Sequence, residues 1–144
     1  MNNNKGFTLI ETVMSIVLLG IIIASILPLI GNSVVTIIES GIRDQAVTTA
    51  TNFTEMIHQE VILRKSEIPE EDWESFKNKT VYFKKDKVDI EYKNSFTFNS
   101  TPNNNKLLFS KEKTDGGYRL KVVFFYNKGE EQIELNSFVS FKRG

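Results

Sequence analysis

The chain contains no cysteine, a single histidine and only three prolines among its 144 residues. Without cysteine there is no disulfide and no thiol for nucleophilic attack or soft-metal binding, so a small extracytoplasmic domain would have to be held by its core alone. Charge of neither sign dominates, since 18 basic side chains balance 18 acidic ones. A neutral chain lacks the basic excess on which general binding to nucleic acids or acidic substrates depends.

Residues suited to enzymatic chemistry are also few. His58, the only histidine, falls beside Ile57 on a segment of helical period, where a solvated or capping role is expected. No glycine-rich phosphate loop is present. Asp86, Asp89 and Asp115 are candidates for a calcium site, but their spacing gives no dense cluster of oxygens, so solvated loop positions are the better interpretation. We therefore expect no catalytic residue, no cofactor and no metal.

What the chain does have is a long apolar run near its N-terminus. The 27 residues from Thr12 to Ile38 carry no charge, and as a helix they would extend about 40 Å. The hydrocarbon core of a bilayer is about 30 Å thick and is crossed by about 20 apolar residues. Glu11 immediately precedes the run, so its carboxylate lies at the membrane, where a charged group usually faces a partner.

Two ordinary explanations of an apolar N-terminus fit less well. A secretory signal peptide has an apolar core of about 7 to 15 residues followed by a small-residue cleavage site. Here Ala24 and Ser25 are small, but the apolar run continues past them. A plain membrane anchor explains the length of the run and leaves Glu11 unexplained.

The residues before the run form a motif, Lys5-Gly6-Phe7-Thr8-Leu9-Ile10-Glu11. This stretch resembles the leader of type IV pilins and pseudopilins, the site cut by prepilin peptidase. The resemblance implies that the chain is cut after Gly6, that Phe7 becomes the N-methylated N-terminus and that Glu11 guides assembly. Gly20 and Pro28 look like the paired helix-weakening positions of many pilins. The implied partners are other pilin or pseudopilin subunits, prepilin peptidase, the inner-membrane assembly platform and membrane lipid.

Elementary electrostatics supports a paired role for Glu11. Cleavage after Gly6 would place a free amine on Phe7, one helical turn from Glu11. Near pH 7 both groups are charged in water, and away from water each stabilises the charged form of the other. Two pairings remain open. The amine can come from the same chain or from a staggered neighbour, and in the second case the pair sets register more than it adds net stability.

The orientation follows from the charge next to the run. Lys5 is the only basic residue before it, which favours a cytoplasmic leader and places residues beyond about 40 outside. We expect a single-pass protein of the cytoplasmic membrane, with its N-terminus inside and its C-terminus outside, that later enters a cell-surface filament.

The predicted fold class is α+β and pilin-like, with one long helix from about Thr8 to Arg64 packed on a small antiparallel β-sheet. Its segments are the leader 1–6, a transmembrane and assembly helix 7–38, an amphipathic continuation 39–65 and an extracytoplasmic β-rich domain 66–144. Pro28 removes a helical hydrogen bond and Gly20 lowers helix propensity, so a kink or local melting is expected within residues 20–32. In the continuation, an apolar stripe recurs with the helical period at Ile42, Ala46, Ala50, Phe53, Ile57 and Val61.

Beyond Ser66 the apolar period changes. Pro69 and the three acids after it have the composition of a first helical turn, which predicts a short helix ending near Phe76 with Trp73 and Phe76 facing inward. Alternating apolar residues then predict short antiparallel strands with one buried face, within 81–83, 88–92, 96–98, 107–109, 118–126 and 133–135. Turns are expected at 84–87, 99–105, 111–117 and 127–129.

The function predicted from these features is structural. We expect a minor pilin or pseudopilin of a type IV pilus or a type II secretion-like filament, processed by prepilin peptidase and assembled through its N-terminal helix. The short chain and generic domain favour a minor subunit over an abundant one. The alternative is a single-pass anchored extracytoplasmic binding or sensory domain whose N-terminus only resembles the leader.

Overall fold

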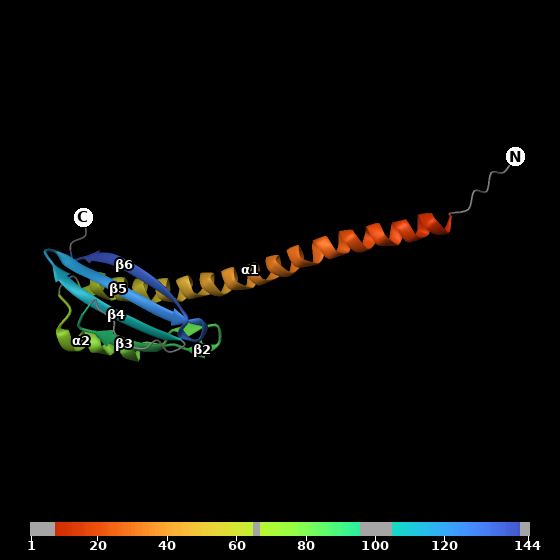
Figure 1. Ribbon diagram of the computed structural model, residues 1–144. Helices are drawn as coiled ribbons and strands as arrows, with labels where there is room; N and C mark the ends of the chain where they lie inside the picture. Colours follow the sequence, from red (N-terminus) through yellow and green to blue (C-terminus); the bar gives the residue numbers. More distant parts are fainter. Residues whose placement is uncertain (1–7, 65–66, 96–104, 142–144) are drawn as a thin grey trace. The chain divides into compact units, whose positions relative to one another are not determined.

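A computed structural model describes residues 8–64, 67–95 and 105–141 of the chain (Figure 1). It forms two compact units, Met1–Gly41 and Ile42–Gly144. In chain order the elements are α1 (Leu9–Arg64), α2 (Glu70–Ser75), the 3-10 helix η1 (Phe76–Asn78), β1 (Tyr82–Phe83), β2 (Asp86–Lys87), β3 (Asp89–Lys93), β4 (Lys106–Thr114), β5 (Gly117–Tyr126), the 3-10 turn η2 (Asn127–Gly129) and β6 (Glu131–Ser140).

The first unit is the N-terminal part of α1. Every residue from Thr8 to Gly41 is exposed, and the helix is long and apolar enough to cross a membrane. Its hydroxyls are satisfied without water, because Ser25 and Ser33 each donate a hydrogen bond of 2.8 Å to the carbonyl four residues earlier. This back-bonding is how polar side chains are accommodated in a helix surrounded by lipid.

The second half of α1 packs on the sheet through the predicted apolar stripe. Ala46, Ala50, Phe53, Ile57 and Val61 are fully buried. Phe53 meets Phe109 of β4 edge to face, with 5.2 Å between ring centroids. The prediction of an amphipathic continuation is confirmed, since the polar residues on the opposite face of the helix are exposed, namely Arg43, Asp44, Gln45, Thr48, Asn52, Glu55 and Gln59.

The main sheet has four strands in the order β3-β4-β5-β6, and β1 and β2 form a separate hairpin. The α+β class is confirmed, but the sheet is not antiparallel throughout. β3 runs parallel to β4, with Asp89 opposite Lys106, whereas β4-β5 and β5-β6 are antiparallel. The alternation of apolar residues is the same in both arrangements, so it could not distinguish them.

Three further details differ from the sequence-based expectation. Residues expected to form a turn at 111–117 extend β4 and β5 instead, and the reversal is confined to Asp115 and Gly116. The turn expected at 84–87 is likewise reduced to Lys84 and Lys85. The sheet also buries side chains on both faces, because Leu108, Val123 and Phe125 form a second buried cluster. The strand expected at 96–98 lies outside the described residues.

The short helix α2 closes one end of the core. Trp73 is fully buried and Phe76 nearly so, as predicted. Trp73 packs edge to face on Tyr118 of β5, with 4.9 Å between ring centroids. The Tyr118 hydroxyl accepts a hydrogen bond of 2.9 Å from the backbone N–H of Ile68, which satisfies a buried donor just before the helix.

Candidate processing and assembly site

The first turn of α1 is closed by a reciprocal pair of residues, Thr8 and Glu11. The Glu11 carboxylate oxygen Oε2 accepts hydrogen bonds from the backbone N–H of Thr8 (2.9 Å) and from its hydroxyl (3.0 Å). The Thr8 hydroxyl oxygen in turn lies 3.4 Å from the backbone N–H of Glu11, as its acceptor. Since α1 begins at Leu9, Thr8 is the N-cap and Glu11 the third helical residue, which is the arrangement of a capping box.

The capping box gives Glu11 a role within its own chain. It satisfies backbone donors that have no partner inside the helix, and such a cap is worth about 1 kcal/mol. A carboxylate in the first turn also interacts favourably with the helix dipole. Part of the reason for an acid before an apolar run is therefore local.

The same geometry leaves the carboxylate able to accept more. Both hydrogen bonds from Thr8 end on Oε2, and an ionised carboxylate has about four lone-pair positions on its two oxygens. Glu11 is exposed, so Oε1 can be reached by a donor from another molecule. A cut after Gly6 would leave the Phe7–Thr8 peptide bond intact and so preserve the capping box.

The site residues predicted from the sequence fall at separate positions along the N-terminal segment. Gly6 and Phe7 fall outside the described residues. Gly20 and Pro28 are inside α1, which is assigned as helix without a break through both positions. Local melting within residues 20–32 is therefore not seen in this structure, and the proposed kink or flexibility at Gly20 and Pro28 stays a prediction.

Thr8 is the functional residue that the sequence-based reasoning missed. That reasoning considered only an amine as the partner of Glu11, either its own or a neighbour's. The signal was present, because a threonine followed three residues later by glutamate, directly before an apolar run, is the sequence pattern of a capping box.

His58 is the most notable titratable residue on the second half of α1. Its Nε2 lies 3.1 Å from the hydroxyl of Ser137 on β6. Burial lowers the pKa of His58, and the nearby carboxylate of Glu55 partly opposes this. Within the described ranges, no group of three or more His, Asp or Glu side chains is placed to hold a metal ion, and Asp86 instead accepts a hydrogen bond from Asn105.

Comparison with known protein families matches residues 1–27 to the prokaryotic N-terminal methylation motif. The matched segment contains the predicted cleavage position, the capping box and the start of the apolar run. The chain therefore carries the N-terminal signature of type IV pilins and pseudopilins, which are substrates of prepilin peptidase. Comparisons with curated proteins and with solved structures gave no match.

Proposed function

We propose that this protein is a minor pilin or pseudopilin, a structural subunit of a type IV pilus or a type II secretion-like filament. The observation that carries the proposal is the methylation motif at residues 1–27 joined directly to a helix that can span a membrane. The second half of that helix contributes its apolar face to the core of a small α+β domain. A subunit of this kind is an assembly component and not an enzyme.

In the proposed mechanism the chain first inserts with its N-terminus in the cytoplasm and its C-terminal domain outside. Prepilin peptidase removes residues 1–6, and the new amine of Phe7 is methylated. The exposed apolar side chains of α1 are then transferred from lipid to contacts with the same helix of other subunits. Both environments exclude water, so the transfer requires little change in the burial of apolar surface.

Glu11 provides a polar contact between subunits after that transfer. In the filament its free oxygen would accept a hydrogen bond from the Phe7 ammonium of a neighbouring subunit, while Oε2 keeps the bonds to Thr8. A charge-assisted contact of this kind is directional. It would therefore fix the axial stagger between two helices whose other contacts are apolar and non-directional. The inner-membrane assembly platform would act on subunits held in this way.

Processing can be tested by co-expressing the full chain with a prepilin peptidase. We expect the wild-type chain to lose its leader, seen as a smaller intact mass. Gly6→Glu should keep the leader, because bulk and charge beside the cut exclude the peptidase. Asn4→Glu is the matched control, because it adds the same charge inside the leader away from the cut, and it should still be processed. Normal cleavage of Gly6→Glu would contradict the proposal, and an uncut wild-type chain would favour a single-pass anchored binding or sensory domain.

A further inference from the structure

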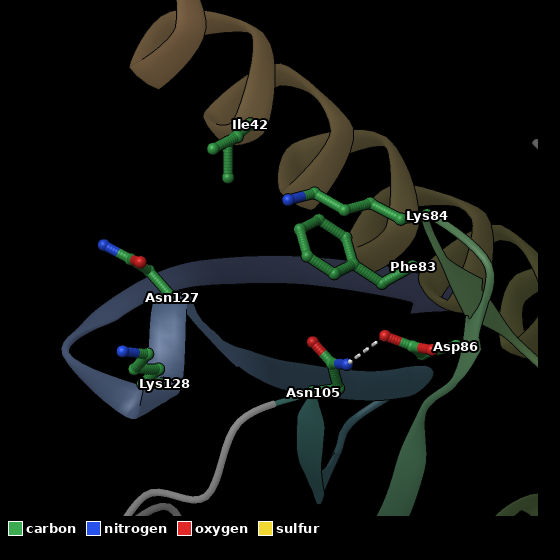
Figure 2. Close-up of a pocket in the computed structure, with 7 residues that line it drawn as sticks. All are labelled: Ile42, Phe83, Lys84, Asp86, Asn105, Asn127 and Lys128. Atoms are coloured by element: carbon green, nitrogen blue, oxygen red, sulfur yellow. Dashed lines mark hydrogen bonds between the residues drawn. The ribbon is translucent and has the colours of Figure 1, made fainter. Parts of the chain in front are cut away.

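The second compact unit contains a cavity that the proposed assembly function does not use. It has a volume of about 160 Å³ and is lined by Ile42, Phe83, Lys84, Asp86, Asn105, Asn127 and Lys128 (Figure 2). These residues come from α1, from the β1-β2 hairpin, from the residue before β4 and from the turn η2 after β5. Residues from four separate segments thus line one small space.

The backbone around this cavity adopts a left-handed conformation at four residues. Lys84, Asn105, Asn127 and Lys128 have φ angles of 58°, 57°, 50° and 61°, and they are the non-glycine residues with positive φ in the part of the chain that the structure describes. All of them line the cavity. Asparagine adopts this conformation readily, but lysine seldom does. Backbone strain at a residue such as Lys84 is found at ligand-binding sites, where the side chain is needed for another reason.

Lys84 shows this conflict most clearly. It is the first central residue of the two-residue turn between Phe83 and Asp86, which face each other in the β1-β2 hairpin. Glycine is the residue favoured at a hairpin position with positive φ. A lysine there gives up backbone stability and places an ammonium beside the cavity, with Nζ at 5.5 Å from the centre of the Phe83 ring. Figure 2 shows this ammonium between Ile42 and Phe83.

The cavity also contains an acceptor in need of a donor. The amide nitrogen of Asn105 points to the Asp86 carboxylate at 3.4 Å, which fixes the amide orientation because the reverse would oppose two acceptors. The other amide atom, Oδ1, is buried and has no hydrogen-bond partner. Buried acceptors are normally satisfied by a hydrogen bond. Asn105 Oδ1 and the Asp86 carboxylate therefore form a group of acceptors for N–H donors, across the cavity from the ammonium of Lys84.

The position of the cavity along the chain indicates where a ligand would come from. Ile42, which lines it, follows Ile38 by four residues, and Ile38 is the last residue of the uncharged run. Four residues are one helical turn, about 6 Å. In a chain anchored through α1, Ile42 itself therefore follows the apolar span by one helical turn, and residues that close to a span lie among phospholipid headgroups.

We propose that this cavity binds the phosphoethanolamine headgroup of a membrane phospholipid. Lys84 would hold the phosphate, and Asp86 with Asn105 Oδ1 would accept hydrogen bonds from the primary ammonium. The proposal rests on the membrane anchoring included in the proposed function. A choline headgroup carries the same phosphate but has no N–H, so it would leave Asp86 and Asn105 Oδ1 without a hydrogen-bond donor. Headgroup binding would hold the domain at the membrane until the subunit is extracted.

Native mass spectrometry of the full chain, released from micelles containing equal amounts of phosphatidylethanolamine and phosphatidylcholine with identical acyl chains, tests this proposal. We expect phosphatidylethanolamine adducts to predominate on the wild-type chain. Lys84→Gly should reduce them about tenfold through loss of one charge-assisted contact, without unfolding the domain, because glycine relaxes the strained turn. Lys85→Ala is the matched control. It removes an equal charge from the same turn at a residue that does not line the cavity, and it should bind as wild type.

Asn105→Gly tests the acceptor side of the cavity separately from the Lys84 side. It keeps the positive φ and removes the unpartnered oxygen but retains the Asp86 carboxylate, so the variant should show a smaller preference for phosphatidylethanolamine than the wild-type chain. Equal binding of both lipids by the wild-type chain would overturn the proposal, as would unchanged adducts on Lys84→Gly. Equally tight binding of soluble phosphoethanolamine, which lacks acyl chains, would overturn the membrane source. The same spectra show whether residues 1–6 are present, so failure of processing is distinguished from failure of lipid binding.

Discussion

At the scale of single residues, Glu11 has one observed role and one proposed role. It caps its own helix through Thr8, and in the proposed filament it would receive a neighbour's amine. The two roles use different properties of the side chain, since the cap needs only an oxygen acceptor whereas the intersubunit contact needs a negative charge. Glutamine retains the first property and removes the second.

This difference gives a test of what Glu11 contributes. Glu11→Gln and Glu11→Ala should both be processed, and both should enter filaments at least about tenfold less than wild type, because each leaves a neighbour's ammonium unpaired in an apolar contact. Thr8→Val should weaken the helix start by about 1 kcal/mol yet assemble almost normally. Quantitative immunoblots of sheared filaments against the membrane pool measure these ratios. Assembly of Glu11→Gln at the wild-type level would show that the charge is not used.

His58 provides a second prediction at the same scale. Because burial lowers the pKa of His58, the unfolded chain, with its ordinary value near 6.5, takes up a proton before the folded chain does. The free energy of unfolding should therefore fall as pH drops from 7 to 5. His58→Gln should flatten this dependence. Trp73, the single tryptophan, is buried, so its fluorescence in denaturant titrations can follow unfolding, and an unchanged pH dependence in the variant would contradict the assignment.

At the scale of secondary-structure elements, the sequence was most informative where one period persists. The apolar stripe from Ala46 to Val61 predicted the buried face of α1, since five apolar residues recur there at four successive helical spacings. The strands of the hairpin β5-β6 were located by alternation, although their ends were not. Parallel pairing of β3 with β4 and burial on both sheet faces depend on contacts between segments distant in the chain, which a local pattern does not contain.

The β5-β6 pair also contains a close approach that the sequence could not reveal. A Cβ built on Gly117 would lie 2.3 Å from the carbonyl oxygen of Val139 and 2.6 Å from Cζ of Phe138. The Phe138 ring can turn away, but the Val139 carbonyl belongs to the backbone of β6. Glycine at the start of β5 is therefore required by space.

Gly117→Ala should accordingly lower the free energy of unfolding by about 1 to 3 kcal/mol, the range for overpacking. Gly41→Ala is the matched control. It lies in α1 with nothing within 4 Å of an added Cβ, and it should leave stability unchanged or raise it by up to about 1 kcal/mol. Chemical denaturation of the full chain in detergent micelles measures both, and equal stability of the two variants would show that β6 shifts freely.

At the scale of the whole molecule, the chain combines an exposed apolar helix with a small domain whose core needs no disulfide. The N-terminal segment could be interpreted from sequence, because the match to the methylation motif at residues 1–27 depends only on contiguous residues. The cavity beside Ile42 could not be foreseen, because Lys84, Asn105 and Lys128 meet only after folding and their backbone conformation leaves no sequence pattern. In the proposed filament subunit, the N-terminal helix would serve assembly and the domain would make contacts outside the membrane.

The most direct test is the intact mass of the protein purified from the cells that make it. Removal of Met1–Gly6 and one added methyl group, located on Phe7 by fragmentation, is the predicted result. A chain that retains Met1, or that begins at Phe7 without methylation, would contradict processing as a pilin-like subunit.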